Sequence, residues 1–146
     1  MQKRHRDKQR YFNEQVYTTE KYVIPFIQQE KNVEASLTVL EIGCGEGGNL
    51  KPFINLGCTC VGEDLSQSKI DNGMKFYAGV SNIELICRDI YDIPDSFGRF
   101  DILIVRDVIE HIHDQGRFLD FVKQFLNQGA IIFVAFPPWQ NPFGGH

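Results

Sequence analysis

The stretch Leu37-Thr-Val-Leu-Glu-Ile42, followed directly by Gly43-Cys-Gly-Glu-Gly-Gly48, decides the fold. Its first half is rich in aliphatic and β-branched residues and predicts a short strand, and its second half is a glycine-rich loop. Helical spacing follows from Asn49 to Leu56, and Gly57 is placed to end that helix. The stretch therefore predicts a strand, a glycine loop and a helix, in that order.

The same alternation of strand and helix continues along the chain. The further elements predicted are strands at 58–63, 83–87, 100–105 and 130–136, and helices at 66–78 and about 114–128. The segment 100–105 is almost continuously apolar, as a strand buried on both faces should be. Ser66 is expected to cap the helix that follows it. Five strands that alternate with helices predict an α/β fold with a doubly wound, mainly parallel sheet.

The N-terminal part has a different pattern, and we expect a helical flank over residues 1–36 beside a core domain over 37–146. Apolar residues between about 10 and 31 have helical spacing, with a break near Thr18 and Thr19 and a bend at Pro25. This segment is expected to pack over the body as a lid or as a flank. Its first residues are crowded with basic side chains, which predict either a solvated helix start or a contact for an anion.

Composition limits the classes of function. The chain has 146 residues, 42% of them hydrophobic and 23% charged, which is typical of one soluble globular domain. A net charge of −4 gives no positive field that would attract nucleic acid. No apolar run approaches about 18 residues, so we expect no membrane span and a cytoplasmic location. The four cysteines lack C-x-x-C spacing, so reduced, mostly buried thiols are expected, without a disulfide framework or a metal site.

The glycine loop is the expected ligand site, because open α/β sheets bind ligands beyond the carboxyl ends of their strands. Glycines allow positive φ angles and let a ligand approach the backbone closely, and the next helix begins with unpaired N–H groups. Asp64 ends the second predicted strand, 21 residues after Gly43, where its carboxylate can accept both hydroxyl groups of a ribose. Together they predict a ligand that contains a nucleoside.

Two kinds of nucleoside ligand fit these features. Gly43, Gly45 and Gly48 satisfy the G-x-G-x-x-G pattern, which would make the chain a NAD(P)-dependent oxidoreductase domain. Glu41, however, shares a face of the strand with Gly43, so a carboxylate stands beside the loop. It would repel a pyrophosphate and favour a ligand that carries an ammonium and a sulfonium group. Glu41 could instead be an ion-paired residue at the strand end.

Several motifs resemble those of class I S-adenosylmethionine-dependent methyltransferases. The segment 39–48 is similar to their first motif, Val61-Gly-Glu-Asp-Leu-Ser66 to their acidic second-strand motif, and Ile86-Cys-Arg-Asp-Ile90 to the end of their third strand. The segment Phe100-Asp-Ile-Leu-Ile-Val-Arg-Asp-Val-Ile-Glu-His111 resembles the fourth-strand region of the small-molecule branch, which includes the type 11/12 and ubiquinone-biosynthesis methyltransferases. The resemblance covers about residues 37–136 and implies a Rossmann-like sheet with strand order 3-2-1-4-5.

The resemblance also implies a site for S-adenosyl-L-methionine. The pocket for the methionine part would be shaped by Gly43, Cys44, Gly45 and Gly47. Glu41 would support the amino end of that part. The core over 37–146 would then be the cofactor-binding domain.

For the nucleoside part, the resemblance assigns residues after three strands. Asp64 would hold the ribose, and Leu65 would lie against the adenine. Asp89 would accept a hydrogen bond from the exocyclic amine, and Ile90 would supply a backbone contact on the same edge. The backbone around Arg106 would close the site from the fourth strand. Asp89 could instead be a turn or cap residue.

The predicted function is methyl transfer from S-adenosylmethionine to a small-molecule acceptor. Because the reaction is an in-line displacement, most of the acceleration can come from alignment of the reacting atoms. If the acceptor is a hydroxyl group, His111 is the candidate base, since histidine titrates near neutral pH. Asp107 and Glu110 could orient the acceptor, or all three residues could simply cap or pair at the start of the next helix.

The end of the sequence departs from the pattern of the family. Methyltransferases of this type usually continue into a sixth and an antiparallel seventh strand, for which nothing follows here. The fifth strand would be an apolar edge, which natural proteins normally cover or charge. We therefore expect a truncated chain with weak stability, or self-association through that edge. A module that binds the cofactor without transferring a methyl group is the third functional possibility.

Overall fold

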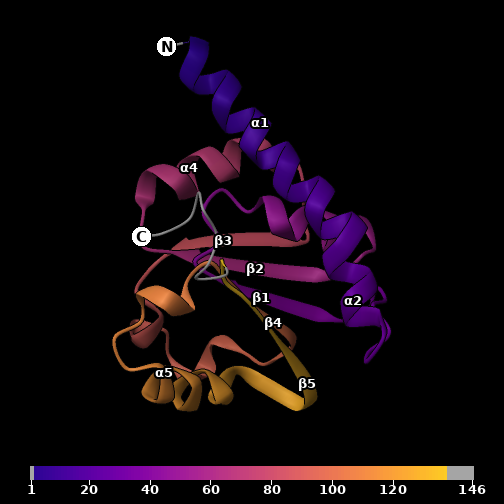
Figure 1. Ribbon diagram of the computed structural model, residues 1–146, viewed down its shortest axis with the longest axis vertical. Coiled ribbons are helices and arrows are strands. Elements are labelled where there is room, and N and C mark those ends of the chain that lie inside the picture. Colours follow the sequence, from indigo (N-terminus) through magenta and orange to yellow (C-terminus); the bar gives the residue numbers. More distant parts are fainter. Residues whose placement is uncertain (1, 138–146) are drawn as a thin grey trace.

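The polar and apolar pattern of the chain builds a five-stranded sheet with helices on both faces. This computed structural model describes residues 2–137. The strands are β1 (Thr38–Ile42), β2 (Thr59–Asp64), β3 (Ile83–Cys87), β4 (Phe100–Arg106) and β5 (Leu126–Ala135). They lie in the order β3-β2-β1-β4-β5, and all four pairings are parallel (Figure 1). The predicted fold class and strand order are confirmed.

The two central strands are apolar because both of their faces are covered. Val39 and Leu40 of β1 have no exposed surface, and neither has Leu103 of β4. Alternate residues of β1 belong to different hydrophobic clusters, since Val39 packs in one and Leu40 in the other. The sheet therefore separates two cores.

Helices α1 to α4 lie on one face of the sheet and α5 lies on the other (Figure 1). Their bounds are α1 (Gln2–Thr18), α2 (Ile24–Gln28), α3 (Lys51–Asn55), α4 (Gln67–Phe76) and α5 (Gln115–Val122). The short 3₁₀ turns are η2 (Gly48–Leu50), η3 (Ile90–Asp92), η4 (Asp95–Phe97), η5 (Ile109–His111) and η6 (Lys123–Phe125). Ser66 caps α4, as predicted, by accepting a hydrogen bond from the Lys69 N–H. Within residues 2–137, no helix combines the length and the apolar character that crossing a membrane requires.

The N-terminal flank differs from the prediction of two helical pieces separated by a break near Thr18 and Thr19. Instead of a break after Thr18, a π-helical turn, η1 (Thr19–Val23), joins α1 to α2, and the residues on either side keep right-handed helical angles. Pro25 lies in the first turn of α2, where its missing N–H is tolerated. Phe12 and Ile27 are buried in the same cluster as Val39 of the sheet. The flank therefore shares its apolar core with the sheet.

The predicted helix over 114–128 was wrong at its end. α5 stops at Val122, and β5 begins at Leu126, before the predicted start at 130. The apolar stripe continues into Phe125, but Leu126 pairs with Phe100 across a bulge in the β4–β5 register. Pairing with β4 thus outweighs the helical pattern in this segment.

The packing of the core on the helix-rich face can be tested at α3. Phe53 of α3 is fully buried, whereas Leu56 at the end of the same helix is 43% exposed. Phe53→Ala should lower the free energy of unfolding by about 3–5 kcal/mol, because it leaves a cavity between tightly packed layers. Leu56→Ala should change it by about 0.5 kcal/mol. Urea denaturation followed by circular dichroism measures both, and similar losses for the two variants would contradict this packing.

Candidate functional site

The candidate site lies beyond the carboxyl ends of β1, β2 and β4. Two adjacent cavities of about 270 Å³ and 160 Å³ open there, and we call them the strand-end cavity and the loop cavity. Gly43, Asp64 and Asp107 line both of them. These three residues therefore lie where the two cavities meet.

The strand-end cavity combines an apolar wall with carboxylates. Its lining residues are Ile42, Gly43, Glu63, Asp64, Leu65, Asp89, Ile90, Tyr91, Asp107, Val108, His111, Ile112 and Phe118. Ile90 and Phe118 are buried, while Leu65 is 71% exposed. Three residues predicted to contact adenine, Leu65, Asp89 and Ile90, are thus brought together in one cavity.

The loop cavity is lined by side chains of both charges. Three of its lining residues were predicted to bind the cofactor, namely Cys44, Gly45 and Arg106. The core domain also contributes Glu46, Asn49 and Lys69 to this lining. Helix α1 contributes Tyr11 and Gln15. A surface that presents carboxylates and cationic groups together suits a zwitterionic amino acid better than a pyrophosphate. The α1 residues were not foreseen from the sequence.

The glycine loop needs glycine for two separate reasons. Gly43 has φ +68°, and a Cβ built there would overlap Cγ2 of Val108. Gly47 has φ +83° but lines neither cavity, and its carbonyl accepts a hydrogen bond from the Tyr77 hydroxyl at 2.5 Å. Gly43 therefore shapes the cavity wall, whereas Gly47 shapes the loop from behind.

Asp64 fastens the glycine loop to the end of β2. Its Oδ2 accepts a hydrogen bond from the Gly45 N–H and its Oδ1 accepts one from the Ser66 N–H, each at 2.8 Å. A carboxylate offers about four acceptor positions, so two remain for a ligand. The structural role was not predicted, and it is compatible with contacts to a ribose.

Glu41 lies behind the loop cavity rather than on its wall. It is 1% exposed, and its Oε1 accepts a hydrogen bond from the Asn49 amide at 3.1 Å. Burial raises the pKa of Glu41 to about 8, although the bond from Asn49 opposes this rise. Its Oε2 has no hydrogen-bond partner among the described residues. The direct hydrogen-bond partner of Glu41 is therefore an amide. The alternative interpretation of Glu41 as an ion-paired residue would require a cation in that place.

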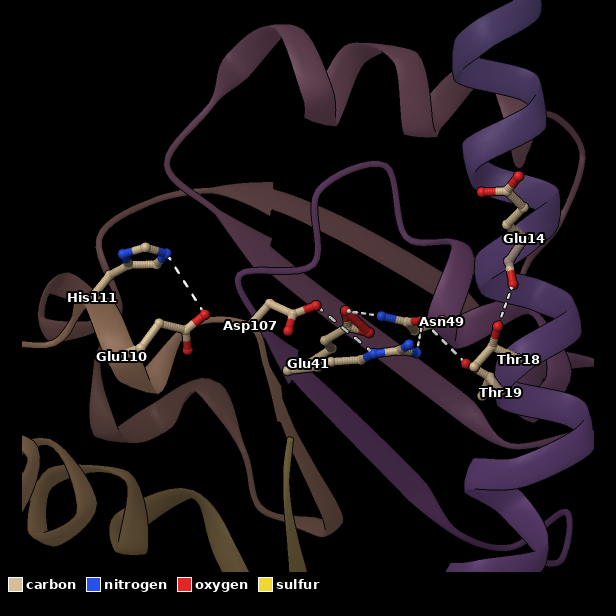
Figure 2. A network of polar contacts seen from close by, with 9 residues as sticks. Glu14, Thr18, Thr19, Glu41, Asn49, Asp107, Glu110 and His111 are labelled. Atoms are coloured by element: carbon tan, nitrogen blue, oxygen red, sulfur yellow. Dashed lines mark hydrogen bonds and ion pairs between the residues drawn. The ribbon is translucent and has the colours of Figure 1, made fainter. Parts of the chain in front are cut away.

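Asn49 joins Glu41 to the N-terminal flank and to β4, as Figure 2 shows for the labelled residues. Its Oδ1 accepts hydrogen bonds from the Thr19 hydroxyl at 3.1 Å and from Arg106 Nη1 at 3.0 Å. Thr19 is buried and begins the π-helical turn, an irregularity that often occurs at functional sites. Asn49 and Thr19 were not predicted as site residues, because these contacts join residues far apart in the chain.

The residues after β4 separate into two environments. Asp107 has φ +56°, a conformation that no other non-glycine residue adopts among residues 2–137, and it lies at the junction of the cavities. His111 lines the strand-end cavity, and its Nε2 lies 3.7 Å from Glu110 Oε1 (Figure 2). The predicted base therefore lies beside the predicted adenine residues.

Asp89 and Glu63 also line the strand-end cavity. The Asp89 Oδ1 accepts a hydrogen bond from the Tyr91 N–H at 2.9 Å. In this structure Asp89 therefore caps η3, as the alternative interpretation of this residue expected.

Glu63 was not predicted as a site residue, since the neighbouring Asp64 accounted for the acidic motif. It is 3% exposed, and burial raises its pKa to about 8. No group of three or more His, Cys, Asp or Glu side chains in the described part of the chain could hold a metal ion.

Comparison with known proteins agrees with this geometry. Residues 12–141 match the methyltransferase domain family. The ubiquinone biosynthesis O-methyltransferases of Nitrobacter winogradskyi and a Bradyrhizobium species are each 37% identical over 106 residues, or 71% of this chain. The chain spans only 40% and 41% of the length of these two relatives.

Solved structures show the same architecture. PKMT2 from Rickettsia typhi in complex with AdoHcy is 29% identical, with a TM-score of 0.69 over 80% of this chain and 25% of that chain. A SAM-dependent methyltransferase from Aquifex aeolicus is 15% identical and shares the fold, with a TM-score of 0.71 over 88% of this chain and 71% of that one. The chain therefore belongs to the methyltransferase domain family, within the class I S-adenosylmethionine-dependent methyltransferases that its motifs resemble.

Proposed function

We propose that the chain binds S-adenosyl-L-methionine across both cavities and transfers its methyl group to a small-molecule acceptor. One observation carries the proposal. Gly43, Asp64 and Asp107 line both cavities, so one ligand can extend over the glycine loop from the first to the second. The nucleoside would occupy the strand-end cavity, and the amino-acid part would occupy the loop cavity.

The lining of each cavity supports this orientation. Leu65 and Ile90 offer apolar surface to adenine, and Asp89 and Asp64 offer carboxylate acceptors to the exocyclic amine and the ribose. In the loop cavity, Arg106 can bind the carboxylate of the amino acid. Glu41 would act on this cavity through Asn49, by holding the amide that orients Arg106.

When bound, S-adenosylmethionine supplies a methyl group activated by a positively charged sulfur. The chain's contribution is to hold the acceptor in line with that methyl group, since the leaving group needs no proton. A third cavity of about 200 Å³ adjoins the junction and is lined by Tyr11, Glu14, Gln15, Thr18, Arg106 and Asp107. This opening between α1 and β4 is the proposed entrance for the acceptor.

The proposed acceptor atom is a hydroxyl oxygen, and the names of the ubiquinone biosynthesis O-methyltransferases support this choice. Asp107 lines all three cavities, so it is better placed than His111 to orient the hydroxyl group and receive its proton. Burial, together with the nearby Asp107, raises the pKa of Tyr11, so its phenol stays a neutral hydrogen-bond donor beside the acceptor.

Family membership does not favour the NAD(P)-dependent alternative. The division at residue 37, the cytoplasmic location and self-association through β5 stay predictions. A non-catalytic module would bind the cofactor without transferring its methyl group, so an assay of methyl transfer distinguishes it from an enzyme.

Binding of S-adenosylhomocysteine, measured by isothermal titration calorimetry, tests the proposed cofactor site. The folded chain should bind it, and Asp64→Asn should weaken binding about 10- to 150-fold, because charge-assisted hydrogen bonds are lost. Asp71→Asn, on the exposed surface of α4, is the matched control and should bind like the wild type. Absence of binding by folded wild-type protein would refute the proposal.

A pair of glycine variants tests the wall at the junction. Gly43 and Gly79 both have positive φ, at +68° and +79°, but a Cβ at Gly79 would meet nothing within 4 Å. Each alanine variant should lose about 1–2 kcal/mol of stability from backbone strain, and Gly43→Ala should lose more because its Cβ would overlap Cγ2 of Val108. Only Gly43→Ala should also lose binding of S-adenosylhomocysteine. Equal affinity in both variants would show that the ligand does not cross Gly43.

Transfer of labelled methyl groups tests the acceptor and its base. With labelled S-adenosylmethionine and a panel of phenols, catechols and amines, we expect label on hydroxyl oxygens. Asp107→Asn should lower turnover about 100-fold or more, as loss of a general base does, while His111→Gln should have a much smaller effect. A larger loss in His111→Gln would restore His111 as the base. Retained cofactor binding without transfer to any compound would indicate a non-catalytic module.

A further inference from the structure

Glu63 places a carboxyl group on an apolar face of the sheet. It pairs in register with Ile42 of β1 and Ile86 of β3. Both isoleucines pack in the hydrophobic cluster on the α5 side, which also contains Phe118. A polar group in such surroundings is costly unless it is hydrogen-bonded. The position of Glu63 therefore requires a partner.

The protein satisfies the Glu63 carboxyl group only in part. The nearby backbone N–H of Gly43 favours its charged form and so lowers the pKa of Glu63. Oε2 is fully buried and has no hydrogen-bond partner within the described part of the chain. Glu63 also lines the strand-end cavity, next to Ile42, Ile90 and Phe118. Its unsatisfied oxygen thus belongs to a side chain on the wall of a ligand-sized space.

We propose that Glu63 is a specificity-determining residue that hydrogen-bonds a ring nitrogen of the adenine in the strand-end cavity. This inference rests on the proposed function, because it assigns the nucleoside to that cavity. The base is favoured over the ribose because Asp64, the next residue, already stands at the junction of the cavities. The apolar side chains of Ile42, Ile90 and Phe118 on the same wall suit a flat heterocycle.

The surroundings of Glu63 keep its carboxyl group neutral near pH 7. Asp64 on β2 itself and Asp89 after β3 both face it with negative charge, and Asp107 and His111 line the same cavity from the end of β4 and from η5. Burial has the largest effect and raises the pKa to about 8, although the Gly43 N–H opposes this rise. A neutral carboxyl group can donate its O–H to a ring nitrogen, whereas a carboxylate cannot.

The direction of the pH effect follows from that donor role. The ligand binds the protein in which the Glu63 carboxyl group is neutral. Its affinity is therefore highest below the pKa of Glu63 and falls as the pH rises through that pKa. Because the pKa of Glu63 is about 8, about one tenth of the protein molecules have a neutral Glu63 and can bind the ligand in this way at pH 9. The dissociation constant of wild-type chain for S-adenosylhomocysteine should therefore rise about tenfold between pH 7 and pH 9.

Titration calorimetry of three variants over this pH range provides the test. Glu63→Gln keeps an N–H donor that does not titrate, so its affinity should match wild type at pH 7 and should lack the tenfold fall. Glu63→Leu should bind about 3- to 10-fold more weakly at pH 7, the loss expected of one hydrogen bond. Glu84→Gln, an exposed glutamate on the neighbouring strand β3, should keep the wild-type profile.

Each outcome bears on a different claim. Titration of the ligand's own amino group and of Glu41 occurs in every variant, so only the difference between wild type and Glu63→Gln counts. Identical pH profiles for these two proteins would overturn the inference and leave the proposed function intact. Absence of binding at every pH by folded wild-type protein would instead overturn the proposed function.

Analogues of S-adenosylhomocysteine identify the contacted atom. Replacing N1, N3 or N7 of adenine by C–H should, for one of the three, weaken binding to wild type about 3- to 10-fold. Glu63→Leu should bind this analogue as tightly as it binds S-adenosylhomocysteine, because the variant has no hydrogen-bond donor at position 63. If all three analogues affect both proteins equally, no ring nitrogen is contacted and the inference fails.

Discussion

The carboxylate of Asp64 is the interaction on which the site depends. It binds the N–H groups of Gly45 and Ser66, so a single side chain fixes the glycine loop and the turn into α4 at the end of β2. Both cavities take their shape from the position of this loop. Since Gly43 has no side chain, the backbone passes Val108 closely and leaves the space beyond the strands open. The site is thus built mostly from backbone geometry.

Two buried glutamates give the sheet its unusual electrostatics. Glu41 on β1 and Glu63 on β2 are almost completely buried, and each has one carboxyl oxygen without a partner among the described residues. Glu41 is held by Asn49, which also binds Thr19 and Arg106. The N-terminal flank is therefore connected to the site by hydrogen bonds as well as by apolar packing.

Much of this could be predicted from local sequence patterns, because strand and helix periodicity is a local property. Five strands and the cap at Ser66 followed from such patterns, but the strand order came from resemblance to a family. The end of α5 could not be foreseen, since Phe125 continues a helical stripe while the pairing of Leu126 with Phe100 ends the helix. Asn49, Tyr11 and Glu63 were missed because their roles depend on contacts between distant segments or on which face of the sheet they occupy.

The central claim is that one ligand crosses the glycine loop, with its nucleoside and amino-acid parts in different cavities. A crystal structure of the chain with bound S-adenosylhomocysteine tests this most directly. The account predicts adenine between Leu65 and Ile90, the ribose at Asp64 and the amino-acid carboxylate at Arg106. Electron density for the ligand confined to one cavity, or on another surface of the molecule, would contradict it.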